Sequence, residues 1–229
     1  MKILAFDTSS KTLSVAVLED NHLLADTTLN IKKNHSISLM PTIDFLMKSL
    51  ELLPSDLERI VVAHGPGSYT GLRVAVATAK MLAYSLNIEL VGVSSLRALC
   101  PSFLKKDTLV IPLIDARRQH VYAGFYSNGQ SIYEDAYLSI DTVLEWARDF
   151  DSVVFVGEVS SFKDLILSSL SNAECFETLP SAYQVGLVGR SLSSENVDTM
   201  VPQYLKRVEA EEVWLENHKD RDDSYIRRI

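Results

Sequence analysis

The hydrophobic and polar positions of the chain alternate with a period of two near its start. Segments 3–7 (ILAFD), 13–18 (LSVAVL) and 23–29 (LLADTTL) carry this alternation, and the polar turns TSSKT and EDN separate them. Short alternating segments with polar turns between them are typical of adjacent strands. The chain is therefore predicted to open with an antiparallel meander of three strands.

The period then changes to that of a helix. Leu39, Ile43, Leu46 and Leu50 follow helical spacing, which predicts a helix over 36–52 with Ser36 as a candidate cap. Further along we expect a strand over 59–63, a Gly-Pro-Gly turn, a helix over 70–86 and a strand over 89–93. Such strand and helix alternation predicts an α/β layer.

The helix over 70–86 has almost no polar face. Small residues recur at every fourth position, at Gly71, Ala75, Ala79 and Ala83, and larger apolar residues fill most of the remaining circumference. Arg73 and Lys80 are its charged residues. A helix that is apolar nearly all round is buried on more than one side, which indicates its own sheet and a partner subunit.

A second meander is predicted over 108–116, 119–126 and 131–138. When Asp7 is aligned with Asp115, Leu13, Val15 and Val17 fall on Val121, Ala123 and Phe125 without a gap. This similarity predicts two related halves, 1–102 and 103–229. The second half is expected to continue with a helix over 141–149, a strand over 153–156 and helices near 161–170 and 182–193. The charged tail from Lys206 is expected to be an exposed helix or partly disordered.

Composition narrows the class of protein. The 229 residues are 47% hydrophobic and 23% charged, which is ordinary for a globular protein, and the formal charge is -8. With this negative charge, the chain as a whole is expected to be repelled by the phosphates of nucleic acid. The sequence has no signal-like or membrane-spanning apolar run, so a cytoplasmic protein is expected. Cys100 and Cys175 lie far apart without a metal-ligand spacing, which favours two buried thiols.

Two α/β halves, each opening with a meander whose first strand ends in Asp, resemble the actin-like, Hsp70 and sugar-kinase (ribonuclease-H-like) fold. Within that fold, four segments together resemble the TsaB family, also called YeaZ: 7–17 (DTSSKTLSVAV), 65–80 (GPGSYTGLRVAVATAK), 114–126 (IDARRQHVYAGFY) and 202–207 (PQYLKR). The resemblance implies a non-catalytic partner subunit of TsaD, which makes threonylcarbamoyladenosine in tRNA. It implies no cofactor, and tRNA contact only through the complex.

The excess apolar surface and the resemblance together suggest how the partner is bound. We expect the helices over 36–52 and 70–86 to meet the equivalent pair of TsaD, and the same surface to form a homodimer. TsaE is expected to meet the assembled pair. The expected contact residues are Leu39, Met40, Ile43, Met47, Gly71, Leu72, Ala75, Val76, Ala79, Lys80 and Ala83. The alternative is that one face packs on the sheet and long side chains cover the other.

The sequence offers little catalytic chemistry. The related catalytic subunit has a helical His-x-x-x-His metal site, and here its place is taken by His35 and Leu39, so neither a metal nor a catalytic residue is expected. The loop with Thr8, Ser9 and Lys11, next to Asp7, could be a vestigial nucleotide site or only a polar turn.

The Gly-Pro-Gly turn matches neither a phosphate-binding Walker loop nor a hydrolase elbow. Its glycines predict a tight turn, with Ser68 or Thr70 capping the following helix.

Two other function classes stay open. The chain could be an independent small-molecule kinase or ATPase, or a degenerate metallopeptidase-like enzyme of the same fold. It could also bind tRNA directly, although acidic neighbours favour a solvated surface for the basic residues concerned. Those residues are Arg117, Arg118, Lys206, Arg207, Arg227 and Arg228.

Overall fold

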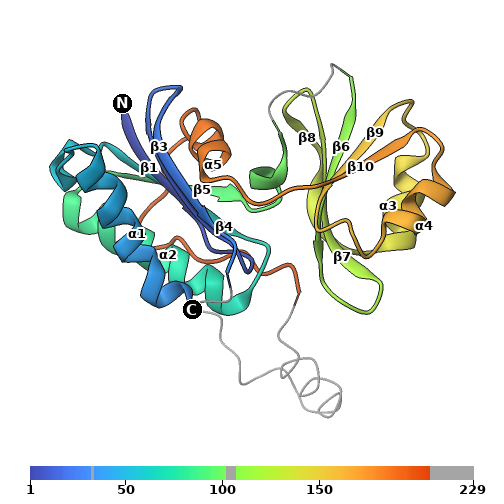
Figure 1. Cartoon of the computed structure of the whole chain (residues 1–229), viewed down its shortest axis with the longest axis horizontal. Helices are drawn as coiled ribbons and strands as arrows, with labels where there is room; N and C mark the ends of the chain where they lie inside the picture. The colour runs from blue at the N-terminus through green and yellow to red at the C-terminus, as the bar shows by residue number, and fades with distance from the viewer. Residues whose placement is uncertain (32–33, 102–106, 207–229) are drawn as a thin grey trace, which may run out of the picture.

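The computed structural model describes residues 1–31, 34–101 and 107–206, and it consists of two five-stranded sheets side by side (Figure 1). The expected tail, including Arg207, Arg227 and Arg228, lies outside the described residues. The first half contains β1 (Lys2–Asp7), β2 (Leu13–Glu19), β3 (His22–Leu29), α1 (His35–Ser49), β4 (Arg59–Gly65), α2 (Tyr69–Leu86) and β5 (Glu89–Ser94), with short 3-10 helices η1 (Pro54–Asp56) and η2 (Arg97–Leu99).

The second half repeats this element order. It contains β6 (Leu109–Asp115), β7 (His120–Ser127), β8 (Gln130–Ser139), α3 (Ile140–Ala147), β9 (Val153–Gly157), α4 (Lys163–Ser169) and β10 (Ala173–Glu177), and α5 (Ala182–Gly189) follows. The sheet orders are β3-β2-β1-β4-β5 and β10-β9-β6-β7-β8, so strands of equal rank occupy equal places. The predicted strands and main helices are confirmed, and β10 was not predicted.

The expected gapless alignment of the halves is wrong by one residue in the first strand. Phe6 pairs with Val15 on the helix-covered face of the first sheet, and Leu113 pairs with Ala123 on the corresponding face of the second. Val15 therefore matches Ala123 as expected, whereas Phe6 matches Leu113 and not residue 114. Because strand side chains alternate between faces, the counterpart of Asp7 is Ile114 and not Asp115.

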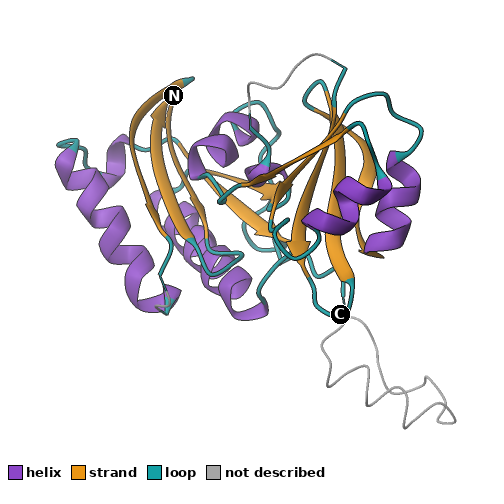
Figure 2. Cartoon of the chain, turned by 45° about the vertical axis from the view of Figure 1, so that its right-hand side comes forward, coloured by secondary structure: helices purple, strands orange, loops and turns teal. Residues whose placement is uncertain are grey.

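Helices cover the outer faces of both sheets, and α5 lies between the halves (Figures 1 and 2). Asn34 caps α1 by accepting a hydrogen bond from the amide of Ser36, so the expected cap at Ser36 is wrong by two residues. Ser68 caps α2 by accepting from the amide of Gly71, as expected. No helix within the described ranges is long and apolar enough to span a bilayer.

The expected boundary between 1–102 and 103–229 is wrong beyond residue 180, because the chain then returns to the first half. In α5, Ala182 and Val185 pack with Ile3 and Ala5 on the face of the first sheet opposite α1 and α2. The amide of Ala182 donates to the hydroxyl of Ser14 at 2.9 Å. The first half is thus built from two separate stretches of chain.

Residues 190–206, which we call the return segment, then follow the edge of the first half. The amide of Glu195 donates to the Leu90 carbonyl at 2.8 Å, and the amide of Gln203 donates to the His64 carbonyl at 2.7 Å. Lys80 Nζ donates to the carbonyls of Asp198 and Met200, both at 3.0 Å. The return segment is therefore tied to β4, β5 and α2.

The halves join where η2 packs on the second sheet. Leu96, Leu99 and Cys100 form one apolar cluster with Tyr126, Val156 and neighbouring side chains. Cys100 is buried there as expected, whereas Cys175 is half-buried on the edge strand β10. This apolar contact joins the two halves.

The close approach of α2 to the loop after β1 predicts an unusual effect of a small substitution. A Cβ atom on Gly71 would lie 2.0 Å from the Thr8 carbonyl oxygen. Gly71→Ala is therefore expected to lower the free energy of unfolding by about 1–3 kcal/mol, although Gly→Ala in a helix normally stabilises. Urea denaturation would measure the change.

Ala77→Ser, on the exposed face of the same helix, is the matched control and should change that free energy little. An unfolding midpoint of Gly71→Ala at or above that of the wild type would contradict the tight contact.

Candidate functional site: the interdomain cleft and the outer helix face

The expected partner-binding residues are mostly buried within the chain itself. Met40 is exposed and Lys80 is half-buried, whereas the other nine lie in the core beneath α1 and α2: Leu39, Ile43, Met47, Gly71, Leu72, Ala75, Val76, Ala79 and Ala83. The row of small residues faces the helix's own sheet, because small side chains let a helix lie close to the strands. As a list of surface contacts, those nine residues are a wrong expectation.

Other apolar side chains of the same helices point outward. Ile37 and Phe45 on α1 are 72% and 62% exposed, and Met81 and Tyr84 on α2 are 63% and 72% exposed. Together with Met40 we call these residues the outer helix face. Exposed residues of this size on two neighbouring helices form an apolar surface of the kind that subunits cover.

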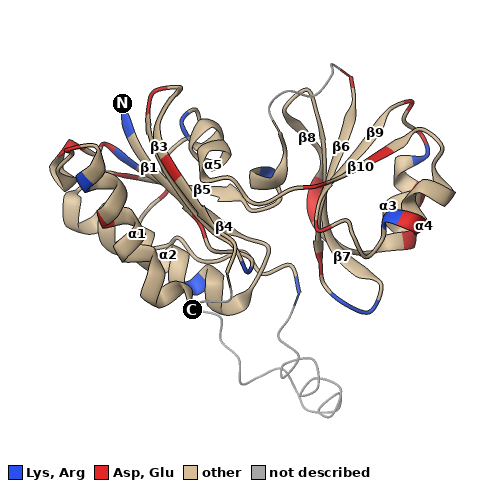
Figure 3. Ribbon diagram, viewed as in Figure 1, with Lys and Arg blue, Asp and Glu red and all other residues tan. Residues whose placement is uncertain are grey.

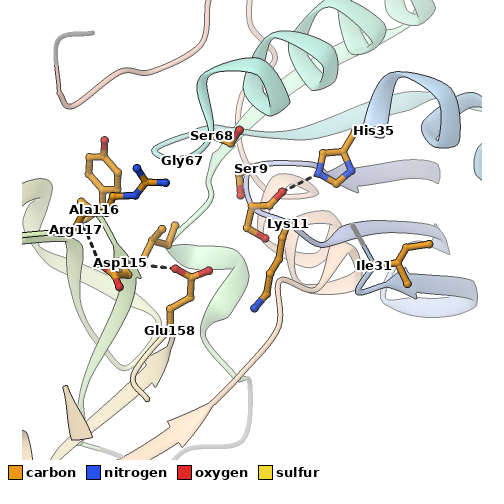
Figure 4. Close-up of a pocket in the computed structure, with 13 residues that line it drawn as sticks. Ser9, Lys11, Ile31, His35, Gly67, Ser68, Asp115, Ala116, Arg117 and Glu158 are labelled. Carbon is orange, nitrogen blue, oxygen red and sulfur yellow. Dashed lines mark hydrogen bonds between the residues drawn. The ribbon is translucent and has the colours of Figure 1, made fainter. Parts of the chain in front are cut away.

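A second feature is an open cleft of about 760 Å³ between the halves. Figure 4 shows its two walls, with the loop after β1 and the start of α2 on one side and the end of β6 on the other. Its lining residues are Ser9, Ser10, Lys11, Ile31, His35, Gly67, Ser68, Ile114, Asp115, Ala116, Arg117, Tyr122 and Glu158.

Asp7 lies beneath the first wall and is completely buried. Its Oδ1 accepts a hydrogen bond from the Ser9 amide at 2.6 Å, whereas Oδ2 has no hydrogen-bond partner among the described residues. Burial raises the pKa of Asp7 to about 6, while the Ser9 hydrogen bonds and the nearby His35 act in the opposite direction. The carboxyl is thus poised between its two protonation states at mildly acidic pH.

The loop after β1 packs directly against the Gly-Pro-Gly turn. The amide of Ser68 donates to the Ser9 carbonyl at 2.6 Å, and Thr8 Oγ1 donates to the Gly71 carbonyl at 2.8 Å. At Gly67, whose φ is +155°, a Cβ atom would lie 2.3 Å from the Ser9 carbonyl oxygen. The amide of Ser68 is thereby used within the protein and does not point into the cleft.

Of the four residues expected in a vestigial nucleotide site, two line the cleft. Ser9 and Lys11 do so, whereas Asp7 and Thr8 are buried behind them. Lys11 is exposed and could bind an anion there. A nucleotide at this place stays a prediction.

The second wall carries Asp115 and Glu158, which were not predicted in any site, and Arg117, which was considered only as a direct tRNA contact. The amide of Asp115 donates to Glu158 Oε2 at 3.0 Å, and the amide of Arg117 donates to Asp115 Oδ1 at 2.7 Å. The adjacent arginines Arg117 and Arg118 are the sequence feature that could have indicated this wall. Glu158 carried no signal, since it follows a short strand without any motif.

The described residues contain no group of three His, Cys, Asp or Glu side chains that could hold a metal. His35 Nε2 instead lies 2.8 Å from the carbonyl oxygen of Ser10. Its ring therefore fixes the loop after β1 to the start of α1.

Comparisons with known proteins identify the family. The family model described as TsaD, tRNA N6-adenosine threonylcarbamoyltransferase, matches residues 22–214. The tRNA threonylcarbamoyladenosine biosynthesis protein TsaB of Bacillus subtilis is 36% identical over 229 residues, which cover 96% of this chain and 100% of the relative. The chain belongs to the TsaB family. It therefore has a role in the biosynthesis of threonylcarbamoyladenosine in tRNA.

Solved structures agree with membership in the TsaB (YeaZ) family. A Pseudomonas aeruginosa protein described as similar to peptidase YEAZ has a TM-score of 0.77 and 26% identity, over 90% of this chain and 99% of its own. Component A of (R)-2-hydroxyglutaryl-CoA dehydratase from Acidaminococcus fermentans has a TM-score of 0.52 and 11% identity, over 83% of this chain and 96% of its own, and shows the fold alone. The fold is the expected actin-like and sugar-kinase fold.

The raised pKa of Asp7 predicts how stability depends on pH. The folded protein binds this proton more tightly than the unfolded chain does. The protonated Asp7 therefore contributes its full share to the free energy of unfolding below pH 3.8, and this share is lost as pH rises through about 6. The loss is expected to reach up to about 3 kcal/mol. Asp7→Asn keeps an acceptor for the Ser9 amide and should remove this loss, as urea denaturation from about pH 4 to 7 would measure.

Asp115→Asn is the control, because Asp115 is exposed at the end of the equivalent strand. Its stability profile should run parallel to that of the wild type. If the Asp7→Asn profile also runs parallel, the buried carboxyl does not titrate in this range.

Proposed function

We propose that this chain is the non-catalytic subunit that binds and activates TsaD for threonylcarbamoyladenosine formation in tRNA, next to the anticodon. The observation that carries the proposal is the outer helix face, where Ile37, Phe45, Met81 and Tyr84 are each more than 60% exposed on two adjacent helices. Association would remove these side chains from water, which is the main favourable term in most subunit contacts.

TsaD is expected to present a helix pair that can pack against the outer helix face. Since the family model described as TsaD matches residues 22–214, the two proteins are expected to share this fold. Each then has a helix pair equivalent to α1 and α2, and the two pairs can meet around an approximate twofold axis. The same geometry allows two copies of this chain to pair, so homodimer and heterodimer would compete for one surface.

The proposal assigns the chemistry to the partner. Asp7, the acid at the end of the first strand, is completely buried behind the loop after β1. We expect TsaE to meet the assembled pair, and tRNA to reach the chain within the complex. Because its proposed substrate is tRNA, we expect the complex to work in the cytoplasm.

Substitutions on the outer helix face test the partner contact. Phe45→Glu and Tyr84→Glu place a charge on exposed positions, so both variants are expected to fold normally. Each should weaken TsaD binding by about 100-fold or more, because a carboxylate would be buried in an apolar contact. Size exclusion with light scattering, on the chain mixed with TsaD from the same organism, would measure the one-to-one complex.

Leu167→Glu is the matched control, since Leu167 is 44% exposed on α4 of the second half. It should bind TsaD like the wild type. If both Phe45→Glu and Tyr84→Glu still form the one-to-one complex, the outer helix face is not the contact. If neither the wild type nor any variant forms a complex with TsaD, the proposed subunit role is wrong.

An independent ATPase is the second candidate, favoured by the unpaired Oδ2 of Asp7 beside the open cleft. Steady ATP hydrolysis by the isolated wild-type chain, lost in Asp7→Asn and retained in Asp164→Asn on the exposed face of α4, would support it.

A further inference from the structure

Aromatic and basic side chains follow one another around the mouth of the cleft. At the start of α2, the Arg73 guanidinium lies 4.0 Å above the Tyr69 ring and its Nε donates to the Tyr204 hydroxyl at 3.2 Å. The rings of Tyr69 and Tyr204 are 5.1 Å apart. This cluster stands next to Ser68, which lines the cleft.

A second cluster lies on the other half, around Tyr137 of β8. The His120 ring stacks on Tyr137 at 4.9 Å, and the Tyr122 ring lies 5.7 Å from it. Lys206 Nζ lies 5.2 Å from the same ring, two residues along the chain from Tyr204. Tyr122 also lines the cleft, so the return segment joins the two clusters at its mouth.

Positive charge is concentrated at this place, although the whole chain carries a formal charge of -8. In Figure 3 the tip of the hairpin between β6 and β7 is blue. Asp115 and Glu158 are the nearby carboxylates on the cleft wall, and each already accepts a backbone amide. We call the following residues the cleft rim: Lys11, Tyr69, Arg73, Arg117, Arg118, His120, Tyr122, Tyr137, Tyr204 and Lys206.

The hairpin tip holds its arginines in an uncommon backbone conformation. Arg117, Arg118 and Gln119 have φ values of 68°, 52° and 60°, which is the left-handed region that favours glycine. Each such non-glycine residue costs roughly 1 kcal/mol. Strain of this kind is typical of sites where a side chain has a function other than stability.

We propose that the cleft rim binds RNA, with its basic groups against the phosphodiester backbone and the exposed rings of Tyr69 and Tyr204 against unstacked bases. The inference rests on the proposed function, in which the chain serves a tRNA-modifying complex. Lysine and arginine neutralise phosphates, and aromatic faces stack on bases of any sequence. The acidic remainder of the surface then restricts RNA to this one face.

The test is fluorescence anisotropy of the full chain with an unmodified tRNA transcript over a range of salt concentrations. Arg117→Gly and Lys206→Ala are each expected to weaken binding about three- to tenfold at low salt and to reduce the salt slope by about one phosphate contact. Lys163→Ala on α4 is the control for loss of a positive charge elsewhere. It should leave both affinity and slope unchanged.

Arg117→Gly also separates an RNA role from a structural one. Relief of the left-handed backbone should leave the melting temperature equal or higher while RNA binding falls. Unchanged RNA affinity in both rim variants, equal losses in Lys163→Ala, or equally tight binding of poly-glutamate would each overturn the proposal. Light scattering with TsaD distinguishes the RNA proposal from the proposed binding of TsaD, because the rim variants should form the one-to-one complex like the wild type.

Discussion

The close packing of α2 on the loop after β1 is the contact on which the rest of the first half depends. At Gly67 and Gly71, even a methyl group would collide with the carbonyl oxygens of Ser9 and Thr8. This approach seats the start of α2 directly on the sheet, and the small residues of the helix continue the contact along its length. The same contact determines which side chains α2 turns outward.

Local periodicity predicted the helices and most strands, but it could not predict which side of α2 is buried. The apolar side of an amphipathic helix indicates which face is buried, whereas a helix that is apolar nearly all round gives no such indication. The small residues indicated a close contact, and only the three-dimensional packing assigns that contact to the sheet and not to a partner. Strand β10, with exposed Glu174 and Glu177, was missed because it is short and lies at a sheet edge.

The candidate site was predicted in part. Lys11 and Ser9 came from the polar loop after the first strand, whereas Arg117 had been considered only as a direct tRNA contact. No local pattern shows that these residues face each other across a cleft, because the distance along the chain carries no information about the angle between the halves. The one-residue error in aligning Asp7 with Asp115 has a similar cause, since both carboxyl groups end a strand but belong to opposite faces.

The return of α5 to the first sheet has a consequence for the order in which the protein is made. Residues 107–180 contain every strand and both helices of the second half, so that half can fold soon after it leaves the ribosome. The first sheet keeps one apolar face bare until Ala182 and Val185 arrive. The half that is synthesised first is therefore completed last, and a chaperone that covers bare sheet faces would act mainly on it.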